Sequence, residues 1–131
     1  MKSLYKIVSI VTSVLFVYLF SQLFFWSDSF VTDLGLEPSI ASLVLARRAS
    51  MFMLGVAVLM FASRNLPPSK VRQIICLSTG ITFLGLSCMG TYEFINSHVN
   101  SSIIIAITIE TILWIFYGII LIKDWKIEKQ Q

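Results

Sequence analysis

Four charged residues lie within the long apolar stretches of this 131-residue sequence: Arg47, Arg48, Glu93 and Glu110. A guanidinium group can bind the anionic head group of a ligand, and a carboxyl group can bind a cation or exchange a proton. Charged side chains are costly inside a bilayer, so they normally face the protein interior, pair with one another and mark functional sites. These residues are therefore the strongest candidates for chemistry in the chain.

Depth counting predicts an ion pair between Arg48 and Glu110. Fifteen uncharged residues separate Arg48 from Arg64, and they cover about 22 Å of a hydrocarbon layer about 30 Å thick. Arg48 then lies about 6 Å below the outer surface of this layer and Glu110 about 10 Å below it, while Glu93 falls at the surface itself. Opposite charges at similar depth favour pairing.

The helical phase of Arg48 supports this prediction. Small residues recur with it every seven positions, at Ala41, Gly55 and Ala62, and small residues let a neighbouring helix approach closely. We therefore expect this face to contact the rest of the bundle, so that Gly55→Leu weakens the fold. Arg47 lies about 100° away around the helix and is expected to extend outward along its apolar stem.

A pocket in the outward half is predicted from the polar residues at similar depth. Its expected members are Tyr18, Gln22, Arg47, Arg48, Tyr92, Glu93 and Glu110. The predicted partners are membrane lipids and a lipidic or quinone-like ligand with an anionic head that meets Arg48. Two other interpretations stay open: the charges only lock the helices together, or they form a docking surface within a homo-oligomer or a larger membrane complex.

Two further functions compete with ligand binding. Glu110 could bind a proton or cation in a small transporter or channel subunit, and Glu93 or Glu110 could serve as the acid or base of a membrane enzyme. Transport requires a polar path through the inner half of the molecule. The polar residues expected there are few: Ser78, Thr79, Thr82 and Tyr117. The sequence therefore favours a one-sided pocket in a non-enzymatic binding protein or accessory subunit.

Composition indicates that the chain belongs in a membrane. Hydrophobic residues make up 56% of it and charged residues 13%, against about a quarter charged in soluble domains. This excludes a soluble enzyme and a nucleic-acid partner. Cys76 and Cys88 are too far apart for a disulfide within one helix, and His98 is the single histidine. No catalytic residue, metal site or cofactor is expected.

Four stretches are long enough to span a bilayer as helices: residues 5–26, 40–63, 73–94 and 103–122. Their short connections contain turn-forming residues such as Pro38 and Pro67, so neighbouring helices must run antiparallel. Residues 1–131 are thus predicted to form a single all-α integral membrane domain, an up-down bundle of four transmembrane helices.

The distribution of charge predicts the orientation. Eight basic residues lie on one side of the four stretches: Lys2, Lys6, Arg64, Lys70, Arg72, Lys123, Lys126 and Lys129. The connections 27–39 and 95–102 contain none, although Phe30, Val31 and Leu34 have the spacing of a short interfacial helix. Basic connections stay in the cytoplasm. Both termini are therefore predicted to be cytoplasmic, in a multi-pass protein of a bacterial inner membrane.

Three short features occur within residues 14–65: Leu34-Gly35-Leu36, Ala46-Arg47-Arg48 followed by Gly55, and Arg64-Asn65. With these features the chain resembles the DoxX-like four-helix bacterial membrane proteins and the small uncharacterised families around them. The resemblance implies a membrane bundle without assigned catalytic residues, in some members an accessory subunit of a quinone-linked complex. In size the chain is also similar to small drug exporters, but their first-span carboxylate has no counterpart here.

Overall fold

The computed structural model describes residues 2–128, and this part of the chain is all-helical. Its helices are α1 (Lys2–Phe25), α2 (Ser27–Asp33), α3 (Ile40–Ser63), α4 (Lys70–Ile95) and α5 (Ile103–Glu128). Within the described residues α1, α3, α4 and α5 are long and apolar enough to cross a membrane. The prediction of an all-α chain with four long apolar helices is therefore confirmed.

Serine caps determine where α3 and α4 begin. The Ser39 hydroxyl accepts a hydrogen bond from the Ser42 backbone N–H at 3.1 Å, and the Ser42 hydroxyl accepts one from the Ser39 backbone N–H at 2.9 Å. This reciprocal cap satisfies two N–H groups that have no partner in the first turn. The Ser69 hydroxyl accepts from the Arg72 N–H at 3.3 Å. Helix α4 consequently begins at Lys70 rather than at the predicted residue 73.

Helix α5 continues past its predicted end at residue 122 as far as Glu128. The added turns are more polar than the rest of the helix. They carry Asp124, whose side chain is buried against α4. This contact and the good helix propensity of lysine and glutamate extend α5 beyond the apolar stretch.

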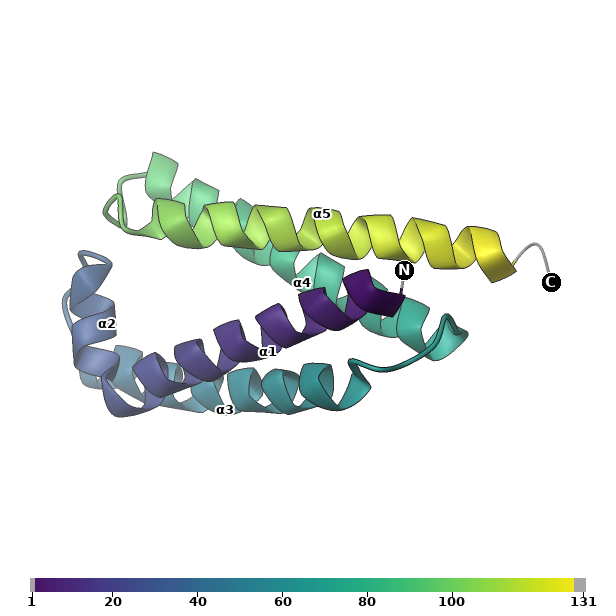
Figure 1. Ribbon diagram of the computed structural model, residues 1–131. Helices are drawn as coiled ribbons and strands as arrows, with labels where there is room; N and C mark the ends of the chain where they lie inside the picture. Colours follow the sequence, from purple (N-terminus) through teal and green to yellow (C-terminus); the bar gives the residue numbers. More distant parts are fainter. Residues whose placement is uncertain (1, 129–131) are drawn as a thin grey trace.

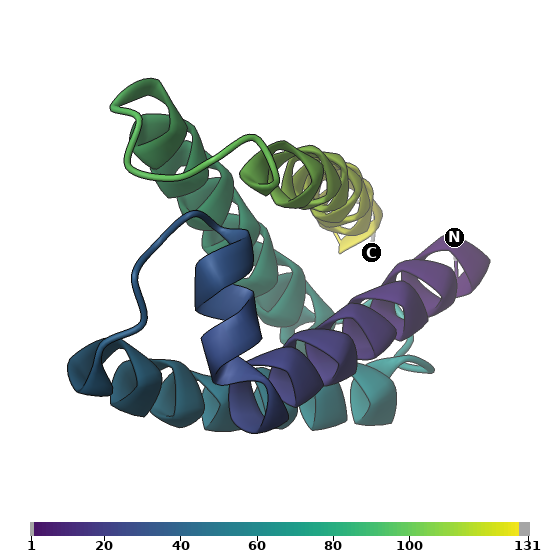
Figure 2. The same cartoon turned by 90° about the vertical axis from the view of Figure 1, so that its left-hand side faces the viewer.

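The four long helices alternate in direction and form two antiparallel hairpins (Figure 1). Helix α3 packs along α1 and α5 packs along α4, whereas contact between the hairpins is mainly between α1 and α5. The hairpins lie close together at the end that holds both termini and diverge toward α2, as Figure 2 also shows. The predicted alternation of helix direction is observed, but the packing is that of a wedge and not of an evenly packed bundle.

A layer of aromatic rings joins the two hairpins near their middle. Phe16 of α1, Phe83 of α4 and Tyr117 of α5 are all buried. The ring centroids of Phe16 and Phe83 are 5.6 Å apart, and those of Phe83 and Tyr117 are 6.2 Å apart. These separations are within the range of favourable aromatic pairs. The layer divides the interior into a closed half near the termini and a wider half near α2.

At the diverging end, Asn100 connects the hairpins. Its side-chain Nδ2 donates to the Asp33 carbonyl at 2.8 Å, and its backbone N–H donates to the Leu34 carbonyl at 2.9 Å. Gly35 has a φ of +82°, a conformation that glycine adopts without strain, and this lets the chain turn after α2. The predicted short helix in this connection is present as α2, with Val31 buried.

Candidate functional site

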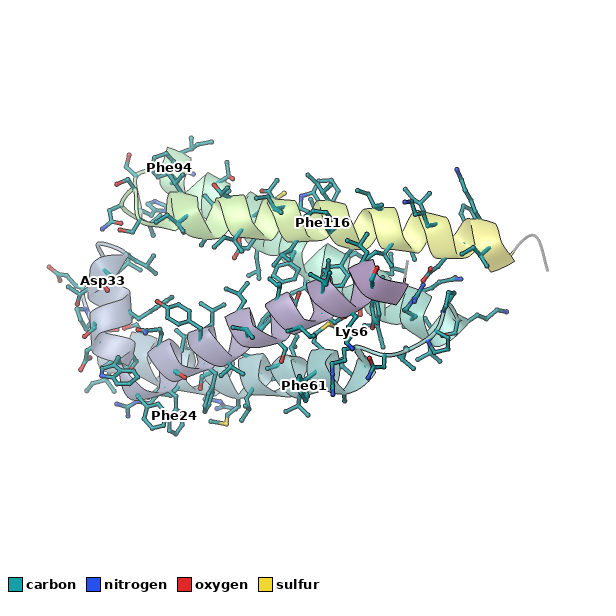
Figure 3. The ribbon with its side chains drawn as sticks, viewed as in Figure 1. Lys6, Phe24, Asp33, Phe61, Phe94 and Phe116 are labelled. Carbon is teal, nitrogen blue, oxygen red and sulfur yellow. The ribbon has the colours of Figure 1, made fainter. Side chains whose placement is uncertain are left out.

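A cavity of about 300 Å³ lies between the two hairpins, in the wider half of the molecule. Residues of α1, α2, α4 and α5 line it, and most of them are apolar. The polar residues on its lining are Tyr18, Gln22, Asp33, Ser102 and Glu110. Figure 3 shows Asp33 at the end of α2, beside the opening between the hairpins. The volume is at the lower end of the range for small-molecule sites.

Glu110, Gln22 and Tyr18 are the predicted site residues that the structure brings together at this cavity. Tyr18 and Gln22 are one turn apart on α1, and Glu110 lines the cavity from α5. Glu110 is partly buried, and its carboxyl group forms no hydrogen bond or ion pair with any residue that the structure describes. The cavity therefore combines apolar walls with a carboxyl group that is available to a ligand.

Phe16 and Phe83 belong to the cavity lining, and both rings are buried between the cavity and the closed half. Next to Phe83, the hydroxyl groups of Tyr117 and Thr12 are hydrogen-bonded at 2.8 Å. The Tyr117 hydroxyl also donates to Met60 Sδ at 3.3 Å. An aromatic layer and a satisfied hydroxyl pair thus separate the cavity from the closed half.

The closed half contains buried hydroxyl groups on α1 that were not predicted. Ser9, Thr12 and Ser13 are buried, and Ser13 donates to the Ala57 carbonyl at 2.8 Å. The Ser9 hydroxyl lies beside that of Tyr117 and makes no hydrogen bond of ordinary geometry with a described residue. The expectation of few polar groups in the inner half is therefore wrong. The sequence does contain a pattern that indicates these buried groups: Tyr5, Ser9 and Thr12 are three or four residues apart and therefore share one helix face.

The predicted ion pair between Arg48 and Glu110 is wrong. Helix α3 packs on α1 through the side that carries Ser50, Ala57 and Met60, and Arg48 is exposed on another side. Glu110 belongs to α5, which packs along α4. Arg48 does not line the cavity, so it lies away from the pocket to which the sequence assigned it.

The small residues that share a face with Arg48 are exposed as well. Ala41, Gly55 and Ala62 lie on the surface of α3, and a Cβ atom added at Gly55 would have no neighbour within 4 Å. The expectation that this face contacts the rest of the bundle is wrong, because α1 covers a different side of α3. Arg47 is exposed too and lies outside the cavity.

Tyr92 and Glu93 lie near the end of α4 and do not line the cavity either. Glu93 Oε2 is 2.6 Å from His98 Nδ1, so its carboxyl group already has a partner within the chain. The Tyr92 side chain is exposed. The structure thus divides the seven predicted residues into three that share the cavity and four that lie elsewhere: Arg47, Arg48, Tyr92 and Glu93.

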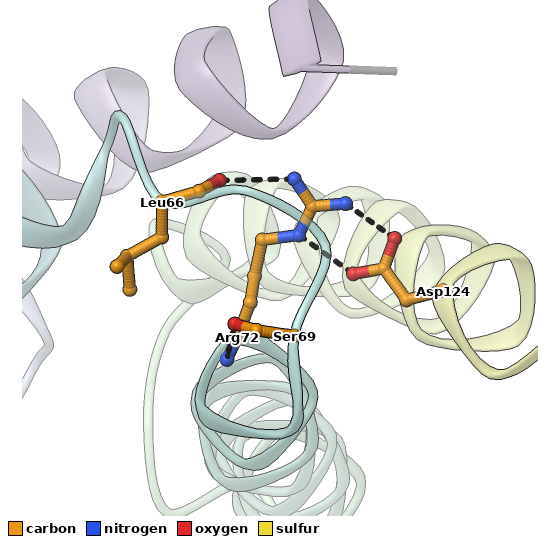
Figure 4. Close-up of polar contacts among 4 residues, drawn as sticks. All are labelled: Leu66, Ser69, Arg72 and Asp124. Carbon is orange, nitrogen blue, oxygen red and sulfur yellow. Dashed lines mark hydrogen bonds and ion pairs between the residues drawn. The ribbon is translucent and has the colours of Figure 1, made fainter. Parts of the chain in front are cut away.

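A second polar cluster occupies the closed end, where Arg72 of α4 and Asp124 of α5 form a buried ion pair (Figure 4). Arg72 Nε donates to Asp124 Oδ2 at 2.6 Å, and Arg72 Nη2 donates to Asp124 Oδ1. Arg72 Nη1 donates to the Leu66 carbonyl at 3.1 Å. The guanidinium carbon lies 5.0 Å from the centre of the Tyr5 ring. These contacts offset the cost of removing both charges from water.

The sequence does not predict this pair, because the position of Arg72 there indicates only a basic residue at the cytoplasmic side. A signal for it exists on α5, where Glu110, Tyr117 and Asp124 recur every seven residues and share one face. Neither Arg72 nor Asp124 lines the cavity. Since each satisfies the other, the pair is a structural link between α4 and α5.

The fold and the site define a class of protein: two hairpins of long apolar helices around an apolar cavity that has the carboxyl groups of Glu110 and Asp33 on its lining. No protein-family model, curated protein or solved structure matches the chain. The resemblance to DoxX-like proteins therefore stays a prediction, and the function is inferred from the cavity itself.

Proposed function

We propose that the chain is an integral membrane protein whose four long helices span the membrane, with both termini in the cytoplasm. Both termini and the connection between α3 and α4 lie at one end of the molecule (Figure 1). Exposed basic residues at that end include Lys6, Lys70, Lys123 and Lys126. The opposite end carries the exposed acids Asp28, Asp33 and Glu37. This asymmetry supports cytoplasmic termini in a multi-pass protein of a bacterial inner membrane.

One of the eight basic residues adds little to this support, because Arg72 is neutralised by Asp124. Lys129 lies outside the described residues, but its position in the sequence still places it on the basic side. The other seven residues contrast with the connections 27–39 and 95–102, which contain no lysine or arginine. The charge bias therefore remains strong enough to set the orientation.

Cysteine labelling tests the orientation. In a variant that lacks the native Cys76 and Cys88, a cysteine at the exposed position Thr32 or Ser97 should react with a membrane-impermeant maleimide in intact cells. A cysteine at Lys126 should react only after the membrane is permeabilised. The reverse pattern would overturn the orientation, and labelling of all three positions in intact cells would contradict membrane insertion.

In this topology the protein binds a small lipidic or quinone-like amphiphile and catalyses no reaction. The observation that carries this proposal is the apolar cavity of about 300 Å³ with Glu110 and Gln22 on its lining. Tyr18 and Ile105 line the cavity and are also exposed on the outer surface, by 58% and 69%. This exposure supports entry of the ligand sideways from the lipid.

The aromatic layer supports binding over transport. A transported molecule would have to pass Phe16 and Phe83, which are buried against each other at the inner end of the cavity. Beyond them, the hydroxyl groups of Thr12 and Tyr117 already bond to one another. A one-sided binding site is the function that this arrangement supports best.

Filling the cavity tests the proposed function. Ala106 lines the cavity, so Ala106→Trp should displace the ligand that is retained when the wild-type protein is purified in mild detergent. Native mass spectrometry should show a bound molecule of constant mass on the wild-type protein and its loss from the variant. Ala62→Trp, on the exposed face of α3, is the matched control and should keep the ligand. Equal retention by both variants would contradict binding in this cavity.

A further inference from the structure

The charged groups on the cavity lining are both acidic. They are Glu110 of α5 and Asp33 of α2, and no lysine, arginine or histidine of the described chain lines the cavity. The exposed guanidinium groups of Arg47 and Arg48 lie on α3, outside it. A ligand with an anionic head would meet carboxyl groups and no compensating base. The cavity is therefore suited to a neutral or a positively charged head.

Glu110 differs from the other carboxyl groups of α4 and α5 whose side chains the structure describes. Glu93 contacts His98 at 2.6 Å, and Asp124 is bound by Arg72. Glu110 has no such partner within the described residues. A carboxyl group in an apolar layer is costly unless it is paired. A cation from outside the chain would supply the partner that Glu110 lacks.

Aromatic rings surround the same space. Phe16, Phe30 and Phe83 line the cavity together with Tyr18, and the faces of such rings attract cations, above all substituted ammonium groups. Gln22 adds an amide oxygen that can accept a hydrogen bond from an ammonium N–H. A carboxyl group among aromatic rings is a combination that recognises an ammonium group.

We propose that the ligand of this cavity carries an ammonium head that binds to Glu110, and an apolar tail that extends into the lipid. This inference rests on the proposed function and names the class of its ligand. At about 30 Å³ for each small group, 300 Å³ holds about ten non-hydrogen atoms. The head and the first methylene groups of the tail therefore fit, and the rest of the tail leaves past Tyr18 and Ile105.

The experiment compares three probes with the same ten-carbon tail: decyltrimethylammonium, decanol and decyl sulfate. The full chain is reconstituted in phosphatidylcholine nanodiscs, and the Kd of each probe is measured by calorimetry at pH 8. The wild-type protein should bind the cation at least about tenfold more tightly than the other two probes, as expected for a contact between full charges. This preference is measured without any variant.

Three variants assign the preference to Glu110. Glu110→Gln should raise the Kd of the cation about tenfold or more and leave that of decanol within about twofold. Glu93→Gln removes the carboxyl group that is paired with His98 outside the cavity, so it should leave all three values within about twofold. Glu110→Asp keeps the charge and should keep the preference for the cation.

The outcomes separate this inference from the proposed function. Equal affinities of the wild-type protein for the three probes, or a Glu110→Gln protein that still prefers the cation, would overturn the ammonium head. Both results would leave the cavity as a binding site. If no probe binds the wild-type protein and Ala106→Trp retains the same native ligand, the proposed function and this inference both fail.

Discussion

Arg72 and Asp124 join the first turn of α4 to the last turns of α5 through an ion pair in which neither side chain is more than 1% exposed. The same guanidinium group bonds to the Leu66 carbonyl and lies over the Tyr5 ring. One side chain thus contacts the α3–α4 connection, α1 and α5. The ion pair joins the two helices of one hairpin, and the contacts of Arg72 with Leu66 and Tyr5 connect this hairpin to the other one at the end opposite the cavity.

Removing one member of this pair should destabilise the protein strongly. Arg72→Met leaves Asp124 buried without its partner, and such a change typically costs about 3–5 kcal/mol. The double variant Arg72→Met/Asp124→Leu should regain most of this loss, since a buried ion pair replaced by apolar side chains is often neutral. The free energy of unfolding in mixed micelles measures each effect. Arg48→Met, an exposed position, should change it by less than about 0.5 kcal/mol.

The cycle also shows whether the two residues act as a pair. If the effects of Arg72→Met and Asp124→Leu simply add, with a coupling below about 0.5 kcal/mol, the ion pair does not hold the fold.

Ser9 and Ser13, one turn apart on α1, should respond differently to the same substitution. Ser13 donates to the Ala57 carbonyl at 2.8 Å, so Ser13→Ala should cost about 1 kcal/mol. The Ser9 hydroxyl is buried and makes no hydrogen bond of ordinary geometry with a described residue. Ser9→Ala removes this unsatisfied group and should be neutral or stabilising by up to about 1 kcal/mol. Equal losses, measured by the same unfolding assay, would mean that Ser9 has a partner in the membrane-bound protein.

Gly55 and Gly90 should also respond differently to the same substitution by alanine. A Cβ atom at Gly90 would come within 2.9 Å of Ile107 Cγ1, between α4 and α5, so Gly90→Ala should cost about 1–3 kcal/mol by overpacking. A Cβ atom at Gly55 meets nothing within 4 Å, and Gly55→Ala should be neutral or stabilising by up to about 1 kcal/mol. Thermal unfolding in detergent compares the two. A large loss at Gly55 alone would show that α3 is covered by a partner.

The sequence is sufficient to predict the four long helices and their alternating direction. An apolar stretch of this length has few alternatives to a long helix, and the connections are too short to join parallel neighbouring helices. The polar ends of helices are harder to predict. Helix α5 extends beyond residue 122 because Asp124 is bound by Arg72, and a contact between residues 52 positions apart is not visible in the local sequence.

The candidate site was predicted only in part, because depth and rotation are separate quantities. Counting residues along a helix places Arg48 and Glu110 at similar depth, but it does not say which side of each helix meets its neighbour. Apolar side chains lie on all sides of α3, so its periodicity does not identify the side that packs on α1. The small residues Ala41 and Gly55 indicate the wrong side of α3 as the side that packs on its neighbour. Arg48 shares that side, so it was placed inside the bundle although it is exposed.

Asn100 should control how firmly α2 covers the cavity. Its side chain donates to the Asp33 carbonyl at 2.8 Å and accepts from the Ser102 backbone N–H at 3.0 Å. Asn100→Ala removes both bonds, each worth about 1 kcal/mol, and should speed hydrogen exchange of the α2 amides about tenfold or more. The amides of α4 near Arg72, at the far end of the molecule, should keep their rates.

Asn96→Ala is the control for this change, since among the described residues the Asn96 side chain bonds only to the Tyr92 carbonyl at the end of α4. Exchange of the α2 amides should be unaffected in that variant. Helix α2 supplies Phe30 and Asp33 to the cavity lining, so the bond from Asn100 also fixes part of the wall that a ligand would touch. Unchanged exchange in Asn100→Ala would mean that contacts with α1 and α3 hold α2 in place, and that the two hairpins move independently at this end.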